Sequence, residues 1–196
     1  MRGRLSIYLP ILFTLLIFSA CNEKREGEKR VPKESGKVVK REKKSVLGSS
    51  FSVSDIDNRT TRIHFEDGKV LVDKVIQPVV IIHLFAPWCP PCRGMLPYLS
   101  DIQRRYSRMV FVIGIVVNSS IDNAQLRTFM KRYDATFFIS NAEDNDRLAR
   151  RLAVELSLPE NYPIPLTLVY KNGERVIDIE GAVPQEMLEN IVEELK

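Results

Sequence analysis

The stretch Val79–Cys92, which reads VVIIHLFAPWCPPC, decides the fold of this chain. Its first half is rich in β-branched and aromatic residues and predicts a buried strand. An Ala-Pro-Trp turn follows, and Pro90 and Pro91 suit the first positions of a helix, where backbone N–H groups have no partner within the helix. The spacing predicts a strand–turn–helix junction, with Cys89 at an exposed helix N-cap and Cys92 one turn inside the helix.

The two cysteines of this junction form a Cys-x-x-Cys pair, which can carry two electrons. A thiolate rather than a thiol attacks disulfides, and the positive end of a helix dipole favours the thiolate. We therefore expect Cys89 to ionise readily and attack a substrate disulfide, and Cys92 to resolve the resulting mixed disulfide. Because Pro90 and Pro91 lack N–H groups, the backbone N–H of Cys92 is the first donor available to the Cys89 sulfur.

Two other roles for the cysteine pair stay open. A structural zinc site needs four ligands, and the chain holds two histidines, His64 and His83, on separate predicted strands. We therefore expect no metal. A purely structural disulfide would close a loop of only two residues, which constrains the chain little. The favoured interpretation is a redox pair that needs no cofactor beyond its own disulfide.

Residues 1–21 have the pattern of an export signal. Arg2 and Arg4 precede an apolar run over Leu5–Phe18, and small residues stand before Cys21. A basic start, an apolar centre and small residues before a cleavage point are typical of a signal peptide. Small residues directly before a cysteine resemble a bacterial lipobox, in which that cysteine is lipidated. The sequence predicts a lipoprotein anchored through Cys21, with an uncleaved signal anchor as the alternative.

The charge of the chain is unevenly distributed. The net charge is +4 overall, but +7 over residues 1–45 and −3 over residues 46–196. Nucleic-acid binding needs a basic face on a folded domain, so the composition argues against a nucleic-acid partner. Residues 22–45 are charged and almost without large apolar side chains, which predicts a disordered tether.

Residues 46–196 are long enough for one domain. Their apolar patterns predict strands interleaved with helices and then a terminal hairpin and helix, an order typical of a mixed sheet covered on both faces. Asn172-Gly173 is a strong signal for the turn of that hairpin. The predicted strands cover residues 51–53, 61–65, 70–72, 79–85, 109–117, 136–139, 166–170 and 175–179, and the predicted helices residues 90–105, 123–133, 144–156 and 184–195.

Three segments together resemble the thioredoxin superfamily. Phe85–Cys92 (FAPWCPPC) is similar to its active-site signature, Pro97 to its helix-kinking proline, and Ile164–Thr167 (IPLT) to its cis-proline segment. An N-terminal β-hairpin and a helical insertion before the proline make the chain most similar to TlpA/ResA-type membrane-anchored thiol–disulfide oxidoreductases. The resemblance covers about residues 50–196 and implies a thioredoxin-like α/β fold, in which helices flank a central mixed β-sheet.

The resemblance also assigns supporting roles around the pair. It implies that a cis-Pro165 lies beside Cys89 and presents the backbone of Ile164 to the substrate. Trp88 would shield the sulfurs and offer an apolar contact surface.

Two residues differ from those expected from the resemblance. His83 stands six residues before Cys89, where thioredoxins place a buried acid, and strand alternation puts it on the face of Ile81 and Phe85. Either it relays the proton of the resolving thiol, or it is a core residue hydrogen-bonded to backbone, which is the favoured interpretation. Met95 occupies a position where many TlpA/ResA-like reductases carry a glutamate, so a role in apocytochrome reduction does not carry over.

The sequence thus predicts a periplasm-facing thiol–disulfide oxidoreductase that reduces protein disulfides through Cys89 and Cys92. It would act as a monomer on disulfide-containing periplasmic proteins and receive electrons from a membrane thiol donor. A disulfide oxidase of the same fold, or a partner-docking or copper-chaperone module, are the alternatives. Asn22 after the lipidated cysteine favours the outer membrane, and the choice between inner and outer membrane stays open.

Overall fold

The computed structural model describes residues 48–196. The predicted leader, the predicted lipidation site at Cys21 and the predicted tether over residues 22–45 lie outside these residues and stay predictions. Within residues 48–196, no helix is long and apolar enough to cross a membrane.

A five-stranded mixed sheet positions the cysteine pair. Its strands are β4 (Val79–Phe85), β5 (Val110–Val116), β6 (Phe138–Ser140), β7 (Leu166–Lys171) and β8 (Glu174–Glu180). The strand order is β6-β5-β4-β7-β8. β4, β5 and β6 are parallel, whereas β7 is antiparallel to β4 and to β8. The continuous apolar sequence of β4 suits this central place, because such a strand is buried on both faces.

A second, smaller sheet precedes the first. Its antiparallel strands are β1 (Ser50–Ser54), β2 (Thr60–Glu66) and β3 (Lys69–Val72), in that order. The three strands predicted over residues 51–53, 61–65 and 70–72 are therefore confirmed, and they form one antiparallel sheet. The buried carboxylate of Asp55 shapes the first turn, because it accepts the backbone N–H groups of Asp57 and Arg59.

Four helices complete the described part: α2 (Pro90–Arg105), α3 (Asn123–Arg132), α4 (Asn145–Leu156) and α5 (Gln185–Glu194). All four lie where the sequence predicts them, with ends that differ by at most one residue. α3, β6 and α4 form the predicted insertion between β5 and β7. The Asp122 carboxylate and the Gln125 side chain form a capping box that starts α3.

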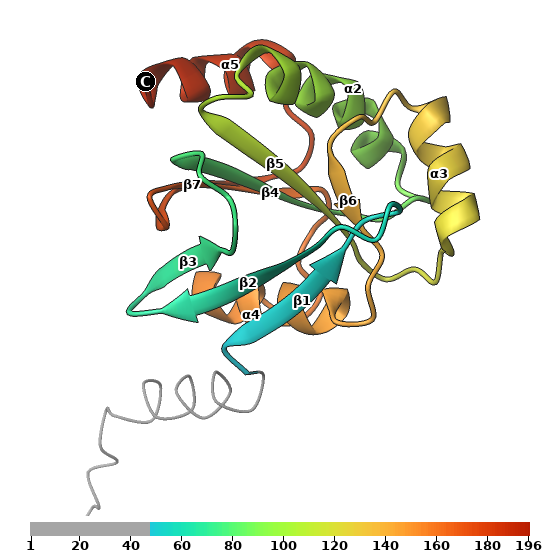
Figure 1. Ribbon diagram of the computed structural model, residues 1–196, viewed down its shortest axis with the longest axis horizontal. Coiled ribbons are helices and arrows are strands. Elements are labelled where there is room, and N and C mark those ends of the chain that lie inside the picture. Colours follow the sequence, from blue (N-terminus) through green and yellow to red (C-terminus); the bar gives the residue numbers. More distant parts are fainter. Residues whose placement is uncertain (1–47) are drawn as a thin grey trace, which may run out of the picture. The chain divides into compact units, whose positions relative to one another are not determined.

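The alternation of β4 divides the core into two layers. Ile81 and Phe85 pack with the apolar faces of α2, α3 and α5, whereas Ile82 and Leu84 pack with α4 and the small sheet. Figure 1 shows this arrangement, with α2 and α5 on one face of the five-stranded sheet and α4 and β1–β3 on the other. The cysteine pair at the start of α2 thus lies on the α2 side of the sheet, next to the end of β4.

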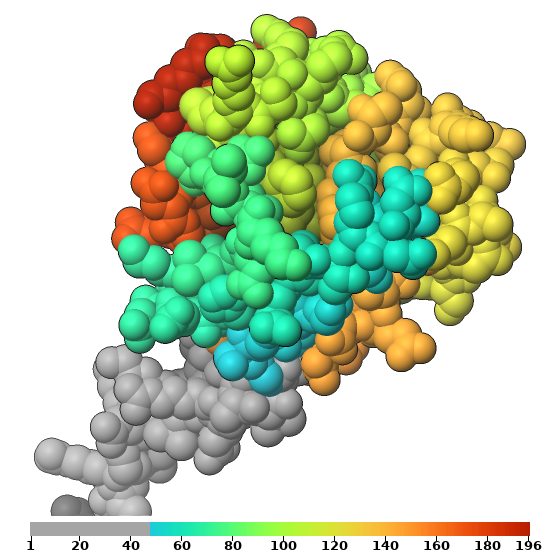
Figure 2. Space-filling model, viewed as in Figure 1, coloured from blue at the N-terminus to red at the C-terminus, as the bar shows by residue number. Residues whose placement is uncertain are grey.

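The surface is hollowed between the small sheet and the edge of the large one. Figure 2 shows β5 at the bottom of this hollow. The hollow has a volume of about 560 Å³ and is lined partly by Phe111 and by Ile76, whose side chain is 91% exposed.

Candidate active site

The two cysteines of the junction form a disulfide at the start of α2. Cys89 is the N-cap residue, Pro90 and Pro91 occupy the first two helical positions, and the Cys92 backbone N–H donates to Cys89 Sγ at 3.2 Å. The predicted cap and its donor are confirmed. The predicted exposure of Cys89 is wrong, because the residue is only 3% exposed and Cys92 is fully buried.

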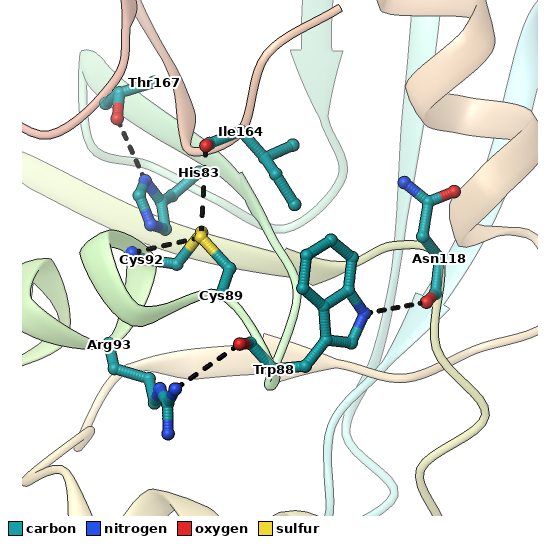
Figure 3. Close-up of a disulfide and its surroundings, with 8 residues drawn as sticks. All are labelled: His83, Trp88, Cys89, Cys92, Arg93, Asn118, Ile164 and Thr167. Carbon is teal, nitrogen blue, oxygen red and sulfur yellow. Dashed lines mark hydrogen bonds between the residues drawn. A yellow bond between two sulfur atoms is a disulfide. The ribbon is translucent and has the colours of Figure 1, made fainter. Parts of the chain in front are cut away.

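The segment before β7 contributes to the burial of Cys89. The Ile164–Pro165 peptide bond is cis, as the resemblance implies. The Ile164 carbonyl oxygen lies 3.9 Å from Cys89 Sγ, and Figure 3 shows it directed at that sulfur. Residues 75 positions apart in the chain therefore meet at the disulfide.

Trp88 presents a large apolar surface beside the disulfide. Its side chain is 60% exposed, and its indole N–H donates to the Asn118 carbonyl at 3.2 Å (Figure 3). Asn118 is the second residue after β5 and has a positive φ of 52°. This hydrogen bond fixes the indole against the β5–α3 connection and leaves most of the ring accessible to a partner. Only the fold brings Asn118 to Trp88, so no local sequence pattern indicates this contact.

His83 is a fully buried side chain on β4, on the predicted face with Phe85. Its Nδ1 lies 2.9 Å from Thr167 Oγ1, and its ring stacks on Phe85 at 5.7 Å between centroids. The expected backbone partner is therefore wrong, because a side chain on β7 takes that place. Nε2 of His83 has no hydrogen-bond partner among residues 48–196.

Burial sets the charge of this histidine. Desolvation lowers the pKa of His83 to about 3, because a charged ring without a counter-ion is costly in an apolar layer. The ring is therefore neutral over the physiological pH range. One ring nitrogen then carries the proton and the other accepts, a state in which a histidine can pass a proton on.

Met95 is buried and packs in the α2 layer of the core. A methionine has no titratable group, so this turn of α2 supplies no ionisable side chain at the position where the resemblance leads one to expect a glutamate. In residues 48–196, no group of three or more His, Cys, Asp or Glu side chains could hold a metal ion.

Arg93 is a residue of this site that the sequence analysis missed. Its guanidinium donates to the Trp88 carbonyl at 3.3 Å and to the Tyr133 hydroxyl at 3.0 Å. The second contact joins α2 to the end of α3, 40 residues along the chain. Its only sequence signal was its position directly after Cys92.

Comparison with known proteins agrees with this geometry. The thioredoxin family profile matches residues 67–134. Thioredoxin 1 of Synechococcus elongatus is 25% identical over 114 residues, which are 58% of this chain and 77% of the relative. The thiol-disulfide oxidoreductase ResA of Bacillus thuringiensis subsp. konkukian is 22% identical over 158 residues, 79% of this chain and 82% of ResA. A thiol:disulfide interchange protein from Chlorobium tepidum has a TM-score of 0.58 at 22% identity, covering 76% of this chain and 94% of that structure.

The strand order, the disulfide at the start of α2 and the cis-proline before β7 define a thioredoxin-like fold, and the predicted fold class is confirmed. Among its homologues the chain has thiol–disulfide oxidoreductases of the ResA type.

Proposed function

We propose that this protein is a membrane-tethered thiol–disulfide oxidoreductase that reduces protein disulfides outside the cytoplasm. The observation that carries the proposal is the setting of Cys89, which caps α2, accepts the Cys92 N–H and lies beside the carbonyl that precedes cis-Pro165. The relatives named as thiol-disulfide oxidoreductases support the same chemistry.

The reaction begins with the dithiol form of the pair. The Cys89 thiolate attacks one sulfur of the substrate disulfide, forms a mixed disulfide and releases the other substrate sulfur as a thiolate, which takes a proton. Cys92 then attacks Cys89 Sγ and releases the second substrate thiol. The pair is left as the Cys89–Cys92 disulfide, and a membrane dithiol donor returns two electrons and two protons by the same exchange.

The surroundings of Cys89 assist both steps. A thiolate at the N-cap accepts the Cys92 N–H and faces the positive end of the α2 dipole, and both effects stabilise its charge. The Ile164 backbone beside the sulfur offers an extended substrate segment a place to pair, so the reacting disulfide would be held in line with Cys89.

Two other functions use the same site. An oxidase would run the exchange backwards and donate the disulfide that the structure contains. The reduction potential separates the two, since thioredoxin lies near −270 mV and a strong oxidant near −120 mV. A docking or copper-chaperone module would bind partners or copper without turning over disulfides.

Trapping tests the proposal directly. The full-length Cys92→Ala protein, expressed in the host, should accumulate mixed disulfides through Cys89, and mass spectrometry then names the partners. The double variant Cys89→Ala/Cys92→Ala is the matched control and should trap none. If the single variant traps nothing and the wild-type protein fails to reduce insulin, the oxidoreductase proposal is overturned.

The membrane anchor is part of the proposal and rests on the sequence of residues 1–21. A Cys21→Ser variant should lose the lipid mass seen on the mature wild-type protein and leave the membrane fraction. A wild-type protein that carries no lipid and stays in the soluble fraction would contradict this part alone.

A further inference from the structure

A groove of about 470 Å³ lies between the start of α2 and one side of α3. Pro87 and Arg93 line it from the cysteine junction, and Phe129, Arg132 and Tyr133 line it from α3 and its end. Pro87 and Arg93 bracket the cysteine pair in sequence, so an occupant of the groove lies next to the reacting disulfide.

Arg93 is held in this groove by two hydrogen bonds, to the Trp88 carbonyl and to the Tyr133 hydroxyl, and it lies 5.7 Å from the centre of the Tyr133 ring. The Tyr133 oxygen accepts from Arg93, so this contact does not use the phenolic proton. That proton therefore stays available for a group that enters the groove. The hydrogen bond from Arg93 lowers the pKa of Tyr133, and Arg132 contributes in the same direction.

The positive charge of the groove is not balanced by the chain. No Asp or Glu of the described residues lines it, and within residues 48–196 neither Arg93 nor Arg132 forms a salt bridge. By contrast, Arg127, which also lies on α3 but does not line the groove, forms a salt bridge with Asp57. α3 itself contains three basic residues and no acidic one.

We propose that this groove binds an aspartate or glutamate side chain of the protein whose disulfide reacts at Cys89. The inference rests on the proposed function and names a feature of its substrates. A guanidinium binds a carboxylate through paired, charge-assisted hydrogen bonds, and the Tyr133 hydroxyl adds a further donor. Pro87 and Phe129 give apolar walls for the methylene groups of the acid, and the volume leaves room for neighbouring side chains of a protein segment.

Peptides of defined charge test the proposal. Each peptide carries one intramolecular disulfide and a single glutamate, placed in turn at successive positions on either side of the first cysteine, and a second series carries glutamine instead. The reduced full-length protein is mixed with each peptide, and the second-order rate constant of reduction is measured. The rate of each peptide with dithiothreitol corrects for its intrinsic reactivity.

At one or more positions, glutamate should raise the rate constant about fivefold over glutamine at low salt. The advantage should shrink as salt is added, because the Debye length falls. Arg132→Gln should lower the ratio towards one. Lys131→Gln is the matched control, since it removes one positive charge from the same turn of α3 without lining the groove, and it should keep most of the wild-type ratio.

The outcomes separate the two proposals. If the wild-type protein reduces both series rapidly and at equal rates at every position, the proposed acidic-residue site in the groove is wrong. The proposed oxidoreductase function is then unaffected. An equal loss in Arg132→Gln and Lys131→Gln also overturns it, because general attraction by α3 then accounts for the preference. If the wild-type protein reduces neither series nor insulin, the proposed function itself fails.

Discussion

Nδ1 of His83 and Oγ1 of Thr167 meet at 2.9 Å and connect the strand that leads to Cys89 with the strand that follows cis-Pro165. The two residues are register partners in the antiparallel pair of β4 and β7. Both are fully buried, so neither can exchange this partner for water. The two segments that hold the candidate active site are thus joined by this side-chain contact as well as by the backbone hydrogen bonds between β4 and β7.

Removing the hydroxyl of this pair should destabilise the fold. In Thr167→Val, Nδ1 of His83 is left buried without its partner, and we expect the free energy of unfolding to fall by about 1–3 kcal/mol. Thr167→Ser keeps the hydroxyl and loses one methyl group, at a cost of about 1 kcal/mol. Chemical denaturation of the oxidised proteins measures both. A valine variant at least as stable as the serine variant would show that the contact adds nothing.

The low pKa of His83 makes stability depend on pH. The folded value is about 3 and the unfolded value about 6.5, so the unfolded chain binds a proton first as the pH falls. Stability is therefore lost progressively from about pH 6.5 down to about pH 3. Between about pH 7 and pH 4 the loss from His83 amounts to roughly 3 kcal/mol.

The His83→Asn variant lacks this titration and serves as the comparison. Its free energy of unfolding should fall less steeply over the same pH range than that of the wild-type protein, while the carboxyl groups contribute alike to both. Parallel stability curves for the two proteins would argue against a strongly depressed pKa of His83.

The role of His83 in proton transfer is open to a kinetic test. If its neutral ring relays the proton of the resolving thiol, His83→Ala should slow disulfide exchange and change the shape of the rate–pH profile. His64→Ala is the control, because it removes the other histidine, which lies on β2 of the small sheet. The relay hypothesis fails when the His83→Ala profile has the same shape as the wild-type profile, even if the rates differ uniformly.

The two prolines of the motif limit the donors at Cys89. An N-cap side chain accepts from the second or third helical N–H, and here Pro91 leaves the third, that of Cys92, as the donor. In Pro91→Ala the second N–H is restored, and we expect the Cys89 thiolate to form at a pH lower by about one unit. The rate of alkylation of the reduced protein as a function of pH measures this.

Pro90→Ala provides the matched comparison, since it restores the first N–H, which a cap residue does not use. Its alkylation profile should stay close to that of the wild-type protein. Equal shifts in both variants would mean that loss of proline rigidity, rather than the added donor, changes the titration.

Local sequence patterns predicted most of the architecture. The apolar run of β4, the prolines at the start of α2 and the Asn-Gly turn between β7 and β8 each specify a conformation within a few residues. Positions that depend on distant segments were missed. Thr167 pairs with His83 through strand register, which no local pattern announces. The Ile164 backbone beside Cys89 was expected only from the family resemblance, and its share in burying the sulfur became clear only from the fold.

The start of β6 within the insertion is another feature that depends on a distant segment of the chain. The short strand predicted over residues 136–139 is found at Phe138–Ser140. The hydroxyl of Ser100 on α2 accepts the Thr136 N–H and donates to the Asp134 carbonyl, so this segment bonds to a helix before it joins the sheet. A side chain 36 residues earlier sets that boundary.

The depth of Cys89 limits what can react there. With only 3% of the residue exposed, Cys89 offers an incoming disulfide little surface, and the Ile164 backbone lies directly beside its sulfur. A disulfide on a loose or still unfolded segment can adapt its position to so little exposed surface more easily than one held inside a rigid domain. We therefore expect the protein to select its substrates by their state of folding, acting on immature chains and sparing mature ones.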